Sequence, residues 1–202
     1  MNRLFRGICW NLTWICAVVL CAQLSACELD TQVKLYQSIE DVELERRVDQ
    51  LLLLIQKRLA IMHEVAKTKW HQHLPIEDKG REQKILADLV EKARQYNLNE
   101  RWAAAFFQVQ MDAAKKVQSS DFFLWETQGQ VDHARVFSLQ NELRSYIDQL
   151  NQEMLMILSQ IDIESLAMKD RLLLDQPIST RSTDSVDGDI WRLAISPLKC
   201  DK

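Results

Sequence analysis

Four charged residues between Arg58 and Arg81 have the types and the spacing to hold a small anion. Arg58 and Lys69 are eleven residues apart, which is three turns of α-helix plus about 20° and roughly 16 Å along the helix axis. Both cations therefore project from one face of one helix. Pro75 breaks that helix, and Asp78 and Arg81, three residues apart, share a face where the next helix begins. We expect this arrangement to bind a small, multiply charged anion.

Two later segments of the chain extend this predicted anion site. Arg58 lies beside an apolar stripe, where a charge must be paired or bind a ligand because burying it alone is costly. Gln110, Ala114 and Gln118 follow one another at four-residue spacing and share another helix face. Arg144 borders a further apolar stripe. Any one of these side chains alone is more typical of a solvated helix surface, so the prediction rests on four cations and an amide meeting inside one bundle.

The composition predicts helices and argues against a nucleic-acid partner. Only four Gly and three Pro occur in 202 residues, and Leu, Ala, Gln, Glu and Lys are abundant. A chain of this length can form one domain with a substantial core. The net charge of −4 is mild and the acids and bases are interleaved. The chain therefore lacks the basic stripe of a nucleic-acid-binding protein.

Apolar residues at three- and four-residue spacing predict an all-α helical bundle built on a long N-terminal helix. The apolar stripe of this first helix runs from Leu35, Ile39 and Val42 to Met62. The predicted helices cover residues 33–71, 78–96 with Asp78 as N-cap, 100–125 with Asn99 as N-cap, 136–166, and a shorter helix within 168–174. We expect a polar linker at 128–130, a loop at 176–189, and a final turn or two at 190–198 that docks through Trp191 and Leu193. The C-terminal helical extension completes the same domain.

The first 26 residues are typical of an export signal. A short cationic start precedes a largely apolar segment from Ile8 to Leu20, whose apolar run is short for a transmembrane span. Leu24-Ser25-Ala26-Cys27 resembles a bacterial lipobox, which predicts cleavage before Cys27 and lipidation of that cysteine. The alternative is ordinary cleavage after Ala26. In that case Cys27 is free or forms a disulfide with Cys200.

Other catalytic chemistries lack their motifs. His71-Gln72-His73 straddles the predicted end of the first helix, and no Cys pair or H-E-x-x-H sequence accompanies it, so we predict no metal site. A G-x-S-x-G nucleophile motif and a glycine-rich phosphate loop are also missing from the sequence.

Residues 40–160 resemble the exported, all-helical AroQ-type chorismate mutases. The resemblance rests on both residue identity and spacing in these runs: Arg58-Leu59, Lys69-Trp70, Leu74-Pro75-Ile76-Glu77-Asp78, Arg81-Glu82, and Phe106-Phe107 with Gln110, Lys115 and Gln118. It implies a core of helices at 27–127 and a C-terminal extension and tail at 128–202. It also implies a periplasmic or secreted enzyme, anchored to the envelope if Cys27 is lipidated.

The resemblance further implies a reaction and a set of roles. The family rearranges chorismate to prephenate without a cofactor, in a unimolecular Claisen rearrangement. By position, Arg58, Arg81 and Arg144 would bind the substrate carboxylates. Lys69 would reach a carboxylate and the ether oxygen, and Gln118 would be the second donor to that oxygen. Asp78 and Glu82 would contact or order the ring-hydroxyl side.

One position departs from the family pattern and leaves alternatives open. Relatives often carry Ser, Thr or Asn where this chain has Ala114, whose methyl group cannot bond the substrate. The alternatives to an enzyme are a non-catalytic helical envelope lipoprotein and a module that binds chorismate or prephenate without turnover. Because Arg144 lies in the same chain, the resemblance is compatible with one site per monomer, and a homodimer stays open.

Overall fold

The computed structural model describes residues 5–129, 137–161 and 187–199, with the backbone alone at residues 5–31 and 140. The described residues form helices and no strands: α1 (Phe5–His71), α2 (Lys79–Gln95), α3 (Glu100–Gln128), the π-helical turn η1 (Leu139–Leu143), α4 (Arg144–Leu158), α7 (Gly188–Ile195) and the 3-10 turn η3 (Ser196–Leu198). The predicted all-α fold built on a long N-terminal helix is confirmed. Three predicted features lie outside the described residues: the helix within 168–174, the part of the loop from 176 to 186, and Cys200.

The chain divides into two compact units, Met1–Arg46 and Arg47–Lys202. In the first unit, helix α1 already begins at Phe5, well before the predicted start at residue 33. Leu35, Ile39 and Val42 are 57%, 59% and 64% exposed, so this part of the predicted apolar stripe is not core within its unit. No helix among the described residues combines the length and the apolar character needed to cross a membrane.

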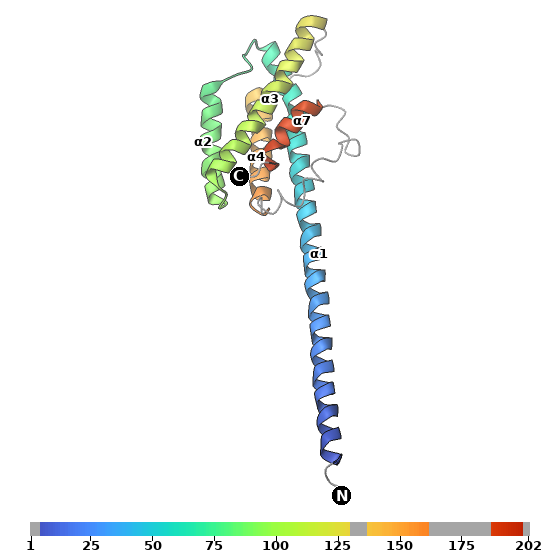
Figure 1. Ribbon diagram of the computed structural model, residues 1–202. Coiled ribbons are helices and arrows are strands. Elements are labelled where there is room, and N and C mark those ends of the chain that lie inside the picture. Colours follow the sequence, from blue (N-terminus) through green and yellow to red (C-terminus); the bar gives the residue numbers. More distant parts are fainter. Residues whose placement is uncertain (1–4, 130–136, 162–186, 200–202) are drawn as a thin grey trace. The chain divides into compact units, whose positions relative to one another are not determined.

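The second unit contains the core. Its part of α1 contributes the apolar stripe from Val48 onward, including the fully buried Leu51, Ile55 and Leu59. Hydrogen bonds join this part of α1 to α3 and α4, and Figure 1 shows α2 on the side of α3 away from α1. Helix α3 is central to the packing, since it contacts both α2 and α7. Its Phe106 and Phe107 are also fully buried.

The connections around α2 follow from capping residues. Helix α1 ends at His71, and Asp78 caps α2 by accepting a hydrogen bond from the backbone N–H of Arg81 at 3.1 Å. Asn99 caps α3 in the same way, with its Oδ1 2.9 Å from the N–H of Trp102. Gly129 ends α3 with a φ of 63°, a left-handed conformation that glycine adopts without a Cβ penalty. The two predicted N-caps are confirmed, and α3 extends three residues beyond the predicted end at 125.

The fourth helix differs from its prediction. In place of one helix over 136–166, Ser138 caps the π-helical turn η1, α4 begins at Arg144, and Ser159 is its C-cap. The apolar periodicity did not reveal the π turn, which differs from an α-helix in its i→i+5 backbone hydrogen bonds. The start of this segment is tied to α1, since the Thr68 hydroxyl donates to the Phe137 carbonyl at 3.3 Å.

The C-terminal extension packs into the same unit. Asp187 caps α7, which therefore begins within the predicted loop. Trp191, Ile195 and Leu198 are buried, whereas Leu193, a predicted docking residue, is half-buried. Helix α7 contacts α3, and Gln110 of α3 donates its side-chain N–H to the Ala194 carbonyl at 2.7 Å. The extension is thus joined to the core through a buried polar contact as well as through apolar packing.

Candidate active site

One cavity of about 230 Å³ lies among α1, the segment after it, α2, α3 and α4. All eight residues that the sequence predicted to face a ligand line this cavity: Arg58, Lys69, Asp78, Arg81, Glu82, Ala114, Gln118 and Arg144. The side chains come from segments that are far apart in sequence. The predicted convergence of four cations and an amide within the bundle is therefore what the fold produces, while the chemical role of each residue stays a prediction.

Arg58 is the most deeply buried cation of the cavity, with 5% of its surface exposed. Its Nε donates to Asn151 Oδ1 at 3.1 Å, and its Nη1 donates to the Gln110 carbonyl at 2.8 Å. Burial lowers the pKa of Arg58 to about 10, because removal from water disfavours the charged form. Within the described part of the chain, no carboxylate lies close enough to form a salt bridge with this guanidinium.

Lys69 lies on the same helix, three turns after Arg58, and its Nζ donates to the Ile76 carbonyl at 2.7 Å. That bond holds the ammonium group against the segment between α1 and α2 and leaves its two other N–H groups for other acceptors. Burial lowers the pKa of Lys69, and the nearby Arg144 and Arg81 lower it further, against the opposing effect of Glu82 and Asp78. The cations of the cavity are therefore close enough to repel one another.

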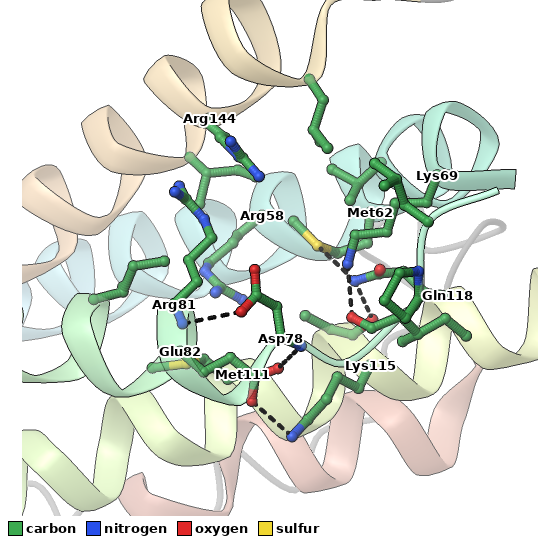
Figure 2. Close-up of a pocket in the computed structure, with 18 of the residues that line it drawn as sticks. Arg58, Met62, Lys69, Asp78, Arg81, Glu82, Met111, Lys115, Gln118 and Arg144 are labelled. Atoms are coloured by element: carbon green, nitrogen blue, oxygen red, sulfur yellow. Dashed lines mark hydrogen bonds and ion pairs between the residues drawn. The ribbon is translucent and has the colours of Figure 1, made fainter. Parts of the chain in front are cut away.

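Arg81 and Arg144 face the cavity from α2 and α4. Figure 2 shows both guanidinium groups on the same side as Arg58, with Lys69 and Gln118 on the other side. Burial lowers the pKa of Arg144, and the positive charge of Arg81 lowers it further. An anion bound among these groups would relieve this repulsion, which is the electrostatic signature of a site built for negative charge.

Gln118 and Ala114 line the cavity from α3. Gln118 is 4% exposed, and its Nε2 donates to the Ala114 carbonyl at 3.2 Å and contacts the Met62 sulfur at 3.7 Å. Because sulfur is a weak acceptor, the second N–H of this amide can serve a better acceptor in the cavity. Among the described residues, Gln118 Oε1 has no hydrogen-bond partner. A buried polar atom without a partner costs about 1–3 kcal/mol of stability, and here that atom belongs to a residue that lines the cavity.

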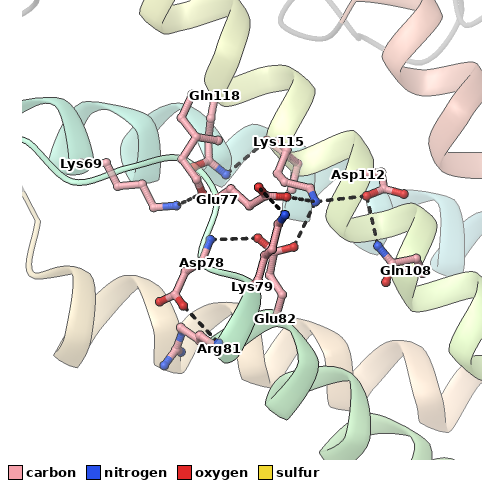
Figure 3. A network of polar contacts seen from close by, with 12 residues as sticks. Lys69, Glu77, Asp78, Lys79, Arg81, Glu82, Gln108, Asp112, Lys115 and Gln118 are labelled. Atoms are coloured by element: carbon pink, nitrogen blue, oxygen red, sulfur yellow. Dashed lines mark hydrogen bonds and ion pairs between the residues drawn. The ribbon is translucent and has the colours of Figure 1, made fainter.

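The acidic residues of the cavity are engaged in local structure. Asp78 caps α2, and Glu82 Oε1 accepts from the Asp78 backbone N–H at 3.2 Å. The other oxygen of Glu82 accepts from Lys115 Nζ at 3.0 Å, and Asp112 and Glu77 lie 3.3 Å and 3.7 Å from the same nitrogen. Figure 3 shows how this network joins α3 to the start of α2. Contact of Asp78 or Glu82 with a substrate remains a prediction.

Asn151 and Lys115 are two of the cavity residues to which the sequence assigned no role. Asn151 lines the cavity and bonds Arg58, and its signal was its position on the apolar face of α4, where a polar side chain needs a partner. Lys115 lines the cavity as well; Asp112 is three residues before it on α3, but Glu77 and Glu82 come from another segment and could not be paired with it by spacing. In the described ranges, no group of three or more His, Cys, Asp or Glu side chains is placed to hold a metal ion.

Residues 43–119 match the family described as chorismate mutase type II. Over this segment, which is less than half of the chain, the chain is similar to that family. The matched segment contains seven of the eight predicted cavity residues, from Arg58 to Gln118, and stops before α4. Arg144 and Asn151 therefore lie outside the matched segment, and only the fold brings them to the same cavity.

Individual proteins are similar to this chain as well. The chain is 34% identical over 99 residues to the secreted chorismate mutase of Mycobacterium tuberculosis, covering 49% of each chain. It is 37% identical over 65 residues to the secreted chorismate mutase of Yersinia pestis, covering 32% of this chain and 35% of that protein. The aligned part thus spans about half the length of the first relative and about a third of the second. The crystal structure of a Burkholderia thailandensis chorismate mutase superposes with a TM-score of 0.68 and 26% identity, covering 75% of this chain and 98% of that one.

Proposed function

We propose that this chain rearranges chorismate to prephenate, using the cavity of the second unit as the active site. The observation that carries the proposal is the convergence of Arg58, Lys69, Arg81 and Arg144 on one cavity, with Arg58 bonded there by neutral acceptors. A substrate with two carboxylates supplies the negative charge that these cations lack. The match of residues 43–119 to the chorismate mutase type II family makes chorismate the dianion to test first.

The proposed mechanism requires positioning and electrostatics alone. The rearrangement breaks a C–O bond and forms a C–C bond within one molecule, so no nucleophile or general base is needed. Three arginines hold the carboxylates and keep the substrate in a compact, reactive conformer. In the transition state, negative charge develops on the ether oxygen. Lys69 and Gln118 lie on the other side of the cavity from the arginines and would donate hydrogen bonds to that oxygen.

Asp78 and Glu82 have a secondary place in this proposal. Both carboxylates lie at the start of α2, where they cap the helix and bond Lys115. They would order the ring-hydroxyl side of the substrate by fixing the position of α2, and so of Arg81. Ala114 adds only a methyl group to the cavity wall, so it cannot form the hydrogen bond that a Ser, Thr or Asn side chain could form from this position.

The test is the disappearance of chorismate, followed by its ultraviolet absorbance, on addition of the purified full chain. We expect turnover well above the uncatalysed rate, and a loss of about a hundredfold in kcat/KM for Lys69→Ala, since one transition-state donor is worth about that much. Lys116→Ala is the matched control, because Lys116 is exposed on α3. No rate above background for the unmodified chain would overturn the proposal, and an unaltered rate in Lys69→Ala would overturn the role of that residue.

A module that binds chorismate or prephenate without turnover is the second candidate function. Ala114 favours it, because the methyl group removes one potential contact with the substrate. Calorimetry with prephenate would show binding in either case, so the two functions are separated by the absorbance assay. A purely structural function for the cations is less well supported, because Arg58 is buried and bonded by neutral groups rather than by carboxylates.

We also propose that the chain is exported and that Cys27 carries lipid. The support is the lipobox-like Leu24-Ser25-Ala26-Cys27 after a cationic start and an apolar run, together with the names of the two secreted relatives. The mass of the N-terminal peptide of the native protein tests this directly. A diacylated or triacylated Cys27 at the new N-terminus is expected, whereas an unmodified Cys27 or an uncleaved segment would contradict it.

Under this proposal, we expect the activity not to depend on the oligomeric state in solution. Every cation of the cavity comes from one chain, so a single copy contains a whole site and a homodimer is not needed to complete it. Activity per chain should then stay constant on dilution, whatever the oligomeric state measured by light scattering. A rate per chain that falls on dilution would contradict this expectation.

A further inference from the structure

The environment of Arg58 is unusual for a buried cation, because both of its acceptors are neutral. Nε donates to the side-chain oxygen of Asn151, and Nη1 donates to the backbone carbonyl of Gln110. Asn151 is 2% exposed, so the amide is as buried as the guanidinium that it bonds. A buried arginine is normally neutralised by a carboxylate. Here the protein orients the cation without neutralising it.

We propose that Asn151 is a positioning and specificity-determining residue: it aims Arg58 at a carboxylate of the ligand, and its neutrality keeps the charge of Arg58 available to that ligand. This inference rests on the proposed function, since it assigns a role within the same cavity. It concerns a residue outside the segment that matches the family.

The hydrogen-bonding groups fix the orientation of both side chains. A guanidinium only donates, so the oxygen of the Asn151 amide must face it. Bonds at Nε and at Nη1 hold the planar group at two points and so determine its plane, and neither bond uses Nη2. Because Arg58 lines the cavity, the donors left over are the ones that can bind a carboxylate there.

Helix α4 couples this orientation to a second cation. Arg144 and Asn151 are seven residues apart, which places them about 20° apart on one helix face, and both line the cavity. One helix therefore supplies a ligand-facing guanidinium and also the acceptor that orients another from α1. Asp148 lies between them on the cavity wall and its charge favours protonation of Arg144. The carboxylate of Asp148 thus acts on Arg144, whereas Arg58 is bonded to the neutral amide of Asn151.

An aspartate at position 151 is the substitution that separates orientation from charge. It has nearly the shape of asparagine and an oxygen that can accept the same bond from Nε, but it adds a negative charge beside Arg58. The internal ion pair that results would compete with the carboxylate of the ligand. Substitution by alanine instead removes the acceptor, which leaves a buried N–H without its partner and Arg58 without a defined direction.

The experiment measures kcat and KM for chorismate in the full chain, together with calorimetric binding of prephenate and the thermal unfolding midpoint. For Asn151→Asp we expect KM and the prephenate dissociation constant to rise about tenfold or more, with kcat within about threefold of the unmodified chain. For Asn151→Ala we expect the larger loss in kcat, about tenfold or more, because Arg58 is no longer held in its reactive position. Gln152→Glu is the matched control, since it adds the same charge one residue away at an exposed position of α4.

The experiment distinguishes a failure of this inference from a failure of the proposed function. If the unmodified chain does not convert chorismate, the proposed function fails at that point. If it does, an Asn151→Asp variant with KM within twofold of the unmodified chain overturns the inference about charge. Equal increases in KM for the aspartate and alanine variants would mean that the Asn151 amide binds the ligand itself, which also overturns it. Should the aspartate variant not fold, unaltered kinetics in Asn151→Ala would overturn the inference about positioning.

Discussion

Arg58 and Lys115 line the same cavity, yet the protein surrounds them with opposite kinds of partner. Lys115 lies within 3.7 Å of three carboxylates, those of Glu82, Asp112 and Glu77, and its pKa is raised chiefly by its hydrogen bond to Glu82. Arg58 is bonded to an amide and a carbonyl, and its pKa is lowered to about 10 by burial. Carboxylates of the protein neutralise the charge of Lys115, whereas the partners of Arg58 leave its charge without a counter-ion.

The difference separates structural charge from charge available to a ligand. Lys115 joins α3 to the start of α2, so its charge stabilises the arrangement that carries Arg81. Arg58 contributes nothing comparable, because a buried cation with neutral partners is a cost to folding. Apolar packing elsewhere offsets this cost, and a substrate anion would neutralise the charge of Arg58. The following experiments test this comparison, from the largest expected effect to the smallest.

Loss of Arg58 should have the largest effect. We expect Arg58→Ala to lower kcat/KM by about a thousandfold, since truncating a buried charge that pairs with the substrate typically costs 2–5 kcal/mol, or about 30- to 5,000-fold. Steady-state measurement of chorismate loss gives this value. Arg94→Ala is the control, because Arg94 is exposed and paired with Glu91 and Glu100. A loss below tenfold would mean that the charge of Arg58 is not used by the substrate.

Gln118 tests the donor on the other side of the cavity. Gln118→Ala should lower kcat by about a hundredfold with a smaller change in KM, because the bond strengthens as charge develops on the ether oxygen. Since the amide does not titrate, kcat of the unmodified chain should be flat between about pH 5 and about pH 7.5. Gln118→Glu should be active only where the introduced acid is protonated, so its kcat should fall as the pH rises. A steep loss in the unmodified chain over this range would contradict the role of Gln118.

The alkaline limb of the pH profile tests Lys69. Its pKa is lowered by burial and by neighbouring arginines, so the free enzyme loses this charge at a lower pH than an exposed lysine would. We expect kcat/KM to fall about tenfold per pH unit once the pH exceeds the pKa of Lys69 in the free enzyme. The fall in kcat should begin at higher pH, because the bound dianion stabilises the charged form. Coincident limbs would argue that Lys69 does not meet the negative charge of the substrate.

Lys115 should give the smallest effect if its charge is structural. We expect Lys115→Ala to change kcat by less than about threefold and to lower stability by at most about 1 kcal/mol, since a partly exposed ion pair is worth little. Thermal unfolding and the absorbance assay measure the two quantities. A loss in kcat as large as that of Arg58→Ala would remove the distinction between the two cations.

Much of the fold was predictable from local signals in the sequence. Asp78 and Asn99 could be identified as N-caps because their side chains bond groups within three residues. The burial of the apolar stripe between Val48 and Met62 followed from apolar spacing, but the exposure of Leu35, Ile39 and Val42 did not. Spacing shows which residues share a face, while burial depends on whether another element covers that face.

The cations of the cavity were predictable from the sequence, but the contacts that hold them were not. The cations could be found because helical spacing places Arg58 and Lys69 together, and the family resemblance linked them to Gln118 and Arg144. The partners of Arg58 could not be found in this way. One is the backbone carbonyl of Gln110, which any residue could supply, and the other is Asn151, which lies 93 positions away in sequence. Contacts of this kind depend on how α1, α3 and α4 pack.

The π-helical turn Leu139–Leu143 has a consequence for how homologous sequences are aligned. It separates Arg144 from Phe137, whose carbonyl is bonded to Thr68 of α1. Deleting one residue from this turn would rotate everything after it by about 100° relative to that attachment, or would break the attachment. If a relative lacks one residue of the turn and is aligned without a gap there, its cavity arginine falls one column away from Arg144, and the relative looks as if it lacked that residue.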